Sequence, residues 1–214
     1  VFTYDGILTN SDYFKKGEVI IQDLSSSLIP KVLDVSRNMT VLDACSAPGT
    51  KTQEIAMFMQ NEGEIIAQDI YEKRVQLIDH LMLKTGVSIV KTKVQDSSVL
   101  NEEYINKFDR VLLDAPCSGL GDLRHKPEIR FHLKPDNIDE LTSLQKKLLE
   151  VNGQYVKEGG ILVYSTCTLN KKENEKQIQT FLKNHSEYEL IEEKTLFPYI
   201  ENSDGFYYAK MRRK

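Results

Sequence analysis

The sequence predicts an α/β protein built on a mostly parallel, doubly wound β-sheet. Short apolar runs that are typical of buried strands alternate along the 214 residues with segments whose apolar side chains recur every three or four positions, as in amphipathic helices. A helix that joins two neighbouring strands packs on the sheet and returns the chain to the same edge, so this alternation favours parallel βαβ units. No internal repeat or low-complexity tract argues for a different architecture.

Five apolar runs bounded by Gly, Pro, Asn or Asp are predicted to be the parallel strands. They are Thr40–Asp43, Glu64–Ile70, Ser88–Val94, Arg110–Asp114 and Gly160–Ser165. Two later strands, Tyr188–Glu192 and Phe206–Met211, follow each other without a clear helix between them. We therefore expect a C-terminal antiparallel hairpin that closes the sheet.

The helices between these strands are predicted from apolar spacing and from capping patterns. The segment after Tyr71 places its apolar side chains on one helical face. A Glu follows three residues after Asn137 and again three residues after Asn170. This spacing is typical of a capping box, so we expect one helix to begin at each Asn.

The first part of the chain does not fit the alternation. We expect residues 1–36 to form an N-terminal extension that leads into one α/β domain over residues 37–214. Within the extension, Gly17–Gln22 is predicted to be a short strand. Leu24–Leu33 is predicted to be a helix, with Asp23 as its cap.

Composition and charge exclude several classes of protein. The chain is 40% apolar and 28% charged with a net charge of −4, which is ordinary for a globular protein and unlike a polycation. No stretch approaches the roughly eighteen apolar residues of a membrane span. Three cysteines indicate a reducing compartment, so we expect a cytoplasmic protein. We also expect no membrane contact and no metal site. The chain begins at Val1 rather than Met, so we expect a fragment or a processed form; the sequence leaves its oligomeric state open.

The first predicted strand runs directly into a turn of mostly small residues. These residues are Cys45, Ser46, Ala47, Pro48, Gly49, Thr50 and Lys51. The turn lacks the three spaced glycines of a dinucleotide fingerprint and the Gly–Lys–Thr order of a P-loop. Asp69 ends the next strand 20 residues after Gly49, where an acid suits ribose hydroxyls, and Asp96 follows the third strand, where it could accept from an adenine amino group. The spacing favours an adenosine cofactor without phosphates; a tight turn with capping aspartates is the alternative.

Two cysteines follow the ends of the fourth and fifth predicted strands. Cys117 lies in Asp114–Gly119 and Cys167 lies in Ser165–Thr168. Because neighbouring parallel strands end at the same edge, we expect both thiols in one crevice beside the cofactor turn. A nucleophilic thiol needs a positive neighbour or a helix N-terminus, which the helix expected at Asn170 could supply. Two small packing residues, or a redox dithiol, are the alternatives.

A basic segment follows the first of these cysteines. From Leu123 to Lys134 the chain carries four Arg or Lys residues against one Glu. The candidates for binding a phosphate backbone are Arg124, His125, Lys126 and Arg130. A solvated basic loop is the alternative, and the position beside the crevice favours the functional interpretation.

Together these residues resemble a known family. Asp43–Thr52, Asp114–Gly119 and Ser165–Thr168 are similar to the motifs of the RNA cytosine-C5 methyltransferases, especially the bacterial Sun or Fmu branch that acts on small-subunit ribosomal RNA. Gly17–Ser26 resembles the segment before the cofactor motif of that branch, and Arg124–Phe131 resembles its loop of Arg, His and Pro. The resemblance runs from about residue 14 to the C-terminus.

The resemblance implies a Rossmann-like methyltransferase domain that uses S-adenosylmethionine. Cys45–Lys51 would hold the methionine part of this cofactor, Asp69 its ribose and Asp96 its adenine. Arg74 is a further candidate on the cofactor side, and Asp114 would lie at the boundary between cofactor and base.

The resemblance also implies the chemistry. Cys167 would be the nucleophile that attacks C6 of cytosine, Cys117 would assist product release, and Asp114 would stabilise the charge pushed into the ring. The expected product is 5-methylcytosine in 16S ribosomal RNA. A transfer RNA target and a non-catalytic RNA-binding module with a retained cofactor pocket are the alternatives, and a nicotinamide-dependent oxidoreductase is disfavoured by the missing glycines.

Two features depart from the family pattern. Thr50 stands where members commonly have a second Gly, which could tighten the methionine pocket. Full-length members of the Sun branch also carry an N-terminal RNA-binding domain related to a transcription antitermination factor, and this sequence has no counterpart of it. We therefore expect that RNA affinity and target choice depend on that N-terminal domain, whereas the chemistry does not.

Overall fold

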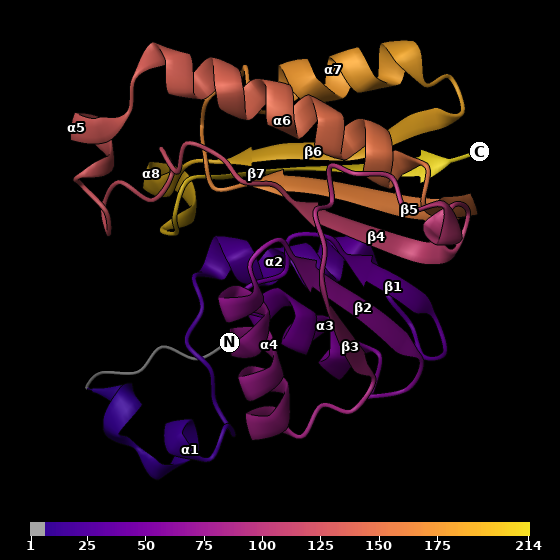
Figure 1. Ribbon diagram of the computed structural model, residues 1–214. Helices are drawn as coiled ribbons and strands as arrows, with labels where there is room; N and C mark the ends of the chain where they lie inside the picture. The colour runs from indigo at the N-terminus through magenta and orange to yellow at the C-terminus, as the bar shows by residue number, and fades with distance from the viewer. Residues whose placement is uncertain (1–6) are drawn as a thin grey trace.

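A computed structural model describes residues 7–214 as a single sheet covered by helices on both faces (Figure 1). Its strands are β1 (Thr40–Asp43), β2 (Glu64–Asp69), β3 (Val90–Val94), β4 (Phe108–Asp114), β5 (Val156–Thr166), β6 (Tyr188–Leu196) and β7 (Phe206–Arg213). Their order is β3-β2-β1-β4-β5-β7-β6. The first five strands pair in parallel, and β7 is antiparallel to both of its neighbours. The predicted parallel sheet and its C-terminal antiparallel hairpin are confirmed.

The helices divide between the two faces of the sheet. They are α1 (Asp12–Lys15), α2 (Leu24–Leu33), α3 (Thr50–Phe58), α4 (Glu72–Thr85), α5 (Ile129–His132), α6 (Pro135–Gly153), α7 (Glu175–Asn184) and α8 (Pro198–Glu201), with the 3-10 turns η1 (Leu8–Asn10) and η2 (Glu102–Tyr104). In Figure 1, α6 and α7 lie at the top, and α2, α3 and α4 lie in the lower half beside β1, β2 and β3.

Strand residues alternate between two apolar cores. On β4, Val111 and Leu113 pack in the core between the sheet and helices α6 and α7. Leu112 packs in the core on the other face, between the sheet and helices α2 and α3. All three are fully buried. Covering both faces removes the apolar–polar alternation of a half-exposed strand, which is why the central strands are continuous apolar runs in the sequence.

Two predicted helix starts were wrong by a few residues. α6 begins at Pro135, and Asn137 lies inside its first turn, where its side-chain oxygen accepts a 3.1 Å hydrogen bond from the backbone N–H of Lys134. Proline suits the first helical position because that position needs no N–H donor. α7 begins only at Glu175, because the chain forms a separate turn after Asn170.

The N-terminal segment confirms one prediction and corrects another. α2 spans Leu24–Leu33 as expected, and the Asp23 carboxylate accepts a 2.8 Å hydrogen bond from the backbone N–H of Ser25. Gly17–Gln22 is not a strand. A strand needs a free sheet edge, and this segment instead crosses the end of α4, where a Cβ on Gly17 would meet the carbonyl of Lys84. The division between residues 36 and 37 stays a prediction.

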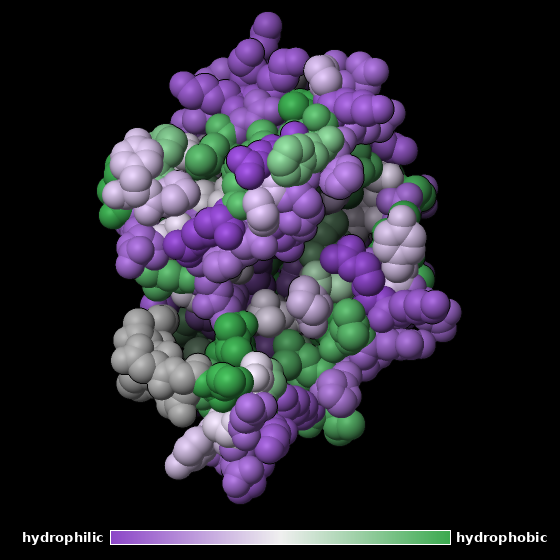
Figure 2. Space-filling view, turned by 90° about the vertical axis from the view of Figure 1, so that its left-hand side faces the viewer, coloured by the Kyte–Doolittle hydropathy of each residue, from purple (hydrophilic) through white to green (hydrophobic). Residues whose placement is uncertain are grey.

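The parallel strands all end on one side of the molecule, at the left of Figure 1. Figure 2 looks onto that side and shows a hollow near its centre, with mostly hydrophilic side chains above it and hydrophobic side chains beside and below it. In open α/β sheets, ligands bind in a crevice at the carboxyl ends of the strands. Among residues 7–214, no helix is long and apolar enough to cross a membrane.

Asp43 ends β1 with its carboxyl group enclosed in the protein. It is 1% exposed, and it accepts a 2.7 Å hydrogen bond from the Thr52 hydroxyl through Oδ2. Its Oδ1 has no hydrogen-bond partner among the described residues. Burial raises the pKa of Asp43 from 3.8 to about 7; the Thr52 hydrogen bond and the Lys51 charge oppose this rise, and the carboxylates of Asp114 and Asp69 add to it.

Replacing Asp43 with Asn should therefore flatten the pH dependence of stability. The folded chain keeps the Asp43 proton up to about pH 7, whereas the unfolded chain releases it near 3.8. The free energy of unfolding should therefore fall as pH rises through this window. We expect urea midpoints to fall less for Asp43→Asn than for the native chain and for an exposed control, Asp136→Asn. An equal fall in all three would contradict the protonated buried carboxyl.

Candidate active site at the carboxyl edge of the sheet

Two thiols meet where β4 and β5 end. These strands pair in parallel with Asp114 opposite Ser165, so the loops that follow leave the sheet side by side. Cys117 and Cys167 lie in these loops, and their sulfur atoms are 3.3 Å apart. The expectation that both thiols come together beyond the ends of these two strands is confirmed, because the register of one strand pair brings their loops side by side.

A partly buried ion pair lies near the thiols. Lys51, in the first turn of α3, places Nζ 2.6 Å from Oδ2 of Asp114. The other oxygen of Asp114 accepts a 2.7 Å hydrogen bond from the Ser165 hydroxyl. Burial is the largest single influence and lowers the pKa of Lys51. The charge of Asp114, the hydrogen bond to it and the charges of Asp43 and Cys167 together outweigh burial, so the net pKa is raised and Lys51 is an ammonium ion. Sequence reasoning placed Lys51 only on the cofactor turn, because nothing in the spacing reveals this contact across the sheet.

The two thiols differ in acidity. The two sulfurs lie at hydrogen-bond distance, at which either can donate. With the Cys117 thiol as the donor, this hydrogen bond lowers the pKa of Cys167; burial opposes this effect and the Lys51 charge supports it. The same hydrogen bond, together with burial, raises the pKa of Cys117. Cys167 is therefore the better nucleophile of the pair. The predicted source of positive charge was wrong, because the helix begins at Glu175 rather than at Asn170.

The turn after β1 is fixed against β2 and α4. Both the backbone N–H and the hydroxyl of Ser46 donate to the carbonyl of Gln68, at 2.9 and 3.0 Å. Gly49 has φ +103°, and a Cβ there would lie 3.2 Å from Ile78, so this position requires glycine. Thr50, at the family's second glycine, is the first residue of α3 and needs no left-handed backbone.

The third thiol belongs to the packing of this turn. Cys45 lies against the apolar core under α6 and α7. Burial, followed by the negative charges of Asp43, Asp114 and Asp69, raises the pKa of Cys45 above its usual value. It is therefore a poor nucleophile. Pro48 is exposed at the tip of the turn.

Two acids border the turn on the cofactor side. Asp69, 4% exposed at the end of β2, pairs with Nη1 of Arg74 at 3.1 Å. Nη2 of Arg74 donates to the carbonyl of Ala47 at 3.0 Å, so this side chain links Asp69 to the turn. Asp96 lies beyond β3, where it accepts a 2.9 Å hydrogen bond from the backbone N–H of Ser98. The roles of these residues toward a cofactor stay predictions.

The structure divides the predicted basic residues. Arg124 bridges Asp204, at 2.6 Å, and Asp23, at 3.0 Å. Lys126 pairs with Asp122 at 2.6 Å. Arg130 forms no ion pair within residues 7–214, and its guanidinium lies 5.0 Å from the Phe131 ring centroid. Much of the charge counted in the sequence is therefore already balanced within the protein.

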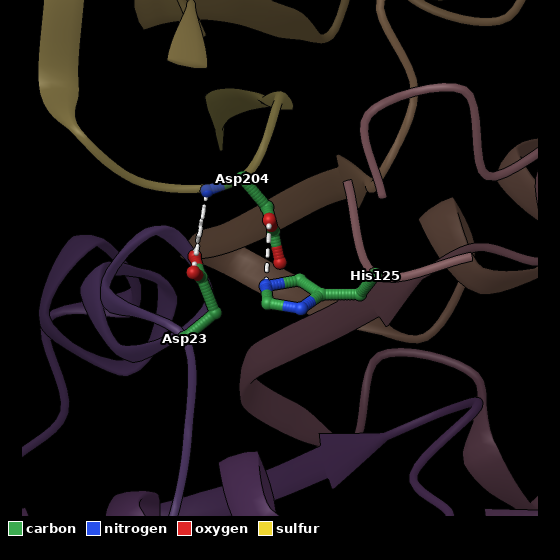
Figure 3. A group of neighbouring side chains, drawn as sticks. All are labelled: Asp23, His125 and Asp204. Carbon is green, nitrogen blue, oxygen red and sulfur yellow. Dashed lines mark hydrogen bonds and ion pairs between the residues drawn. The ribbon is translucent and has the colours of Figure 1, made fainter. Parts of the chain in front are cut away.

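Figure 3 shows Asp23, His125 and Asp204 close together, a set of side chains that could in principle bind a cation. His125 lies 3.4 Å from Asp204. The guanidinium of Arg124 contacts both carboxylates and supplies their counter-charge. A metal ion would have to displace this arginine, so the donor set does not fit a metal site.

Comparisons with known proteins agree on one family. The family model described as 16S rRNA methyltransferase RsmB/F matches residues 30–212. A probable ribosomal RNA small subunit methyltransferase B from Bacillus subtilis is 37% identical over 98% of this chain and 51% of its own length. A ribosomal RNA small subunit methyltransferase B from Yersinia enterocolitica is 35% identical over 94% of this chain and 48% of its own length.

Solved structures give the same result. NSun6 from Pyrococcus horikoshii, crystallised with SFG, is 30% identical over 97% of this chain and 56% of its own, with a TM-score of 0.90. A methyltransferase homologue from the same organism is 33% identical over 99% of this chain and 73% of its own, with a TM-score of 0.88. A SAM-dependent O-methyltransferase from Thermotoga maritima is 18% identical over 91% of this chain and 67% of its own, and shares the fold alone, with a TM-score of 0.59.

The chain spans about half the length of the curated relatives it matches. Within that half, the similarity covers the sheet, the turn after β1 and both cysteine loops. The fold is that of SAM-dependent methyltransferases. The chain belongs to the 16S rRNA methyltransferase RsmB/F family.

Proposed function

We propose that this chain methylates C5 of a cytosine in RNA, through a covalent bond between Cys167 and C6 of the base. The observation that carries the proposal is the pair of thiols 3.3 Å apart, with the Lys51–Asp114 ion pair beside them. A thiolate and a second, protonated thiol are what addition to the ring and later release require. The names of the curated relatives support small-subunit ribosomal RNA as the substrate.

The residues at the turn after β1 fit S-adenosylmethionine as the cofactor. The turn is a short stretch of mostly small residues at the carboxyl end of β1, fixed by Gly49 against Ile78, and Asp69 is a buried acid at the position that suits ribose. The NSun6 relative was crystallised with SFG, a SAM analogue. Cys45–Lys51 would hold the methionine part and Asp96 the adenine. S-adenosylmethionine would supply the electrophilic methyl group of its sulfonium sulfur to C5, leaving as S-adenosylhomocysteine.

The first step uses Cys167. Its thiolate adds to C6, forming the S–C6 bond, and the electron pair of the C5–C6 double bond makes C5 nucleophilic. The Lys51 ammonium and the Asp114 carboxylate are the charged pair beside this sulfur. Asp114, held by Lys51 and Ser165, would have to take up a proton from solvent before sharing it with N3 of the ring, and this shared proton would limit the charge that develops there.

The second step uses Cys117. In the free chain the pKa of Cys117 is raised most by the hydrogen bond to Cys167 and less by burial. Bonding of Cys167 to C6 removes the negative charge that this hydrogen bond serves, so the Cys117 thiol becomes easier to ionise. Cys117 releases its own proton to solvent. As a thiolate it then takes the C5 proton, the C5–C6 double bond re-forms, and Cys167 leaves C6 as a thiolate. The order of the two steps is thus built into the coupling of the thiols.

Covalent trapping tests this assignment. We expect Cys117→Ala protein, incubated with S-adenosylmethionine and unmodified ribosomal RNA, to give an RNA-linked band on a denaturing gel, because release is blocked after Cys167 has attacked. The Cys117→Ala/Cys167→Ala double variant is the control and should give no band.

Cys167→Ala should lose methyl transfer and keep cofactor binding; retained turnover would refute the mechanism. A band with transfer RNA alone would keep the chemistry and change the substrate.

The charge of Lys51 should control the acidity of Cys167. Lys51→Gln removes the positive charge that favours the thiolate, so we expect the midpoint of Cys167 alkylation by iodoacetamide, mapped by mass spectrometry, to move to higher pH. The rate of Cys167 alkylation at pH 7 should fall accordingly. Lys91→Gln is a matched control, because Lys91 pairs with Glu64 at an exposed site on the sheet. An unchanged midpoint in Lys51→Gln would contradict the electrostatic role.

Arg130 should contribute more to RNA binding than Arg124 or Lys126, because no carboxylate among the described residues balances its charge. Arg124 and Lys126 are paired with carboxylates, whereas Arg130 has no acidic partner in the described part of the chain. We expect Arg130→Ala to reduce the slope of log K against log salt by about 0.7 for single-stranded RNA. Arg37→Ala, at the opposite edge of the sheet, should leave it unchanged. Equal slopes for both variants would place the RNA elsewhere.

A further inference from the structure

The turn between β5 and α7 contains a carboxylate that the mechanism above does not use. Glu173 is fully buried, and within residues 7–214 no Lys, Arg or His forms an ion pair with it. A buried carboxylate without a cation is unfavourable unless hydrogen bonds replace its hydration. In the sequence this residue resembled only half of a capping box. The capping interpretation was wrong, because the side chain points into the protein.

The donors to Glu173 come from both cysteine loops. Its Oε2 accepts a 2.8 Å hydrogen bond from the backbone N–H of Ser118, and its Oε1 accepts a 2.6 Å hydrogen bond from the Ser118 hydroxyl. Oε1 also lies 3.4 Å from the Thr168 hydroxyl, which is itself 2.8 Å from the Ser118 hydroxyl. Ser118 directly follows Cys117, and Thr168 directly follows Cys167.

The residues that precede the cysteines are held by neighbours of Glu173. Gln145, fully buried on α6, donates to Oε2 of Glu173 at 3.1 Å and to the carbonyl of Pro116 at 2.9 Å. Asn174 accepts from the Thr166 hydroxyl at 2.6 Å. Glu173, Gln145 and Asn174 therefore together contact the chain on both sides of each cysteine.

The sheet alone does not fix the distance between the sulfurs. Paired register ends at Asp114 and Ser165. Residues 115–119, which include Cys117, have no regular secondary structure, and the same holds for residues 167–170. Beyond the last pair, two backbone hydrogen bonds still join the loops, from Ala115 N–H to the Ser165 carbonyl at 2.8 Å and from Gly121 N–H to the Cys167 carbonyl at 2.9 Å, but neither involves Cys117 or the residues on either side of it. Glu173 is the side chain that accepts from both loops at once.

We propose that Glu173 is a positioning residue that holds the two cysteine loops together, so that Cys117 stays within reach while Cys167 is bonded to the base. The catalytic meaning of this role rests on the proposed function, whereas the spacing of the thiols does not. Glu173 itself touches neither sulfur. It acts through Ser118 and Thr168.

Two replacements separate the acceptor geometry from the charge. In Glu173→Gln, the amide oxygen can accept from Ser118 N–H and from Gln145, and the amide NH₂ can donate to the hydroxyls of Ser118 and Thr168, which accept as well as donate. This variant should preserve the tie. In Glu173→Ala, the same donors lose their acceptor and the loops lose their common partner.

The test is the thiol–disulfide equilibrium of the 214-residue chain with glutathione, without RNA or cofactor. Cys117 and Cys167 are oxidised to one disulfide while one glutathione disulfide is reduced to two glutathione molecules, and mass spectrometry gives the equilibrium constant. We expect Glu173→Ala to lower this constant by about tenfold or more, because the effective concentration of one thiol at the other falls. Glu173→Gln should stay within about threefold of the native chain.

Two further variants keep the outcome decisive. Asn152→Ala removes a fully buried polar side chain of α6 that bonds only to backbone carbonyls away from the cysteine loops, and it should leave the constant unchanged. Ser118→Ala deletes a single hydroxyl and should lower the constant by a smaller factor, which provides the test if Glu173→Ala does not fold. A native constant in Glu173→Ala or in Ser118→Ala, or an equal fall in Asn152→Ala, would overturn the proposal.

The same variant links the tie to methyl transfer. With S-adenosylmethionine and RNA, Glu173→Ala should lower kcat by about tenfold, leave KM for the cofactor unchanged and accumulate the RNA-linked species, because Cys117 is less often in place for release. Unchanged kcat would overturn the positioning role. Failure of covalent trapping in Cys117→Ala would refute the proposed function. The thiol–disulfide equilibrium would then still test whether Glu173 holds the two loops together.

Discussion

The parallel pairing of β4 with β5 is the constraint on which the rest of the site depends. With Asp114 opposite Ser165, the two loops after these strands leave the sheet together, and the thiols of Cys117 and Cys167 come within 3.3 Å. A shift of one residue would turn every side chain of one strand to the other face of the sheet. The apolar residues that cover both faces of β4 therefore protect the chemistry as well as the fold.

Burial of charge gives this edge of the sheet its reactivity. Lys51 and Asp114 form an ion pair in which only a small part of each side chain meets solvent, 13% and 24%. In such surroundings a positive charge acts strongly on a nearby sulfur, because little water screens it. Glu173 carries a second buried carboxyl group. Hydrogen bonds from the cysteine loops stabilise it, and no cation among the described residues pairs with it. One buried pair thus adjusts acidity, and the lone carboxylate adjusts position.

The basic loop shows why a count of charges is a weak guide to binding. Arg124 joins Asp23, which caps α2, to Asp204, which precedes β7, so three segments far apart in the sequence meet at one guanidinium. Its charge is balanced there, and its first effect is on the placement of the loop. Arg130, exposed beside Phe131, presents charge and an aromatic ring to the solvent at the same edge.

The sequence by itself determined the strands, their parallel arrangement, the closing hairpin and the two cysteine loops, because apolar periodicity and strand-end motifs are local signals. Helix starts at Asn137 and Asn170 and a strand at Gly17–Gln22 were wrong, since a cap or an edge partner depends on neighbours that spacing does not reveal. Only the tertiary structure decided that Lys51 faces Asp114 and that Glu173 joins both cysteine loops. These contacts join residues on different elements, and it is packing, which the order of residues along the chain does not display, that brings them together.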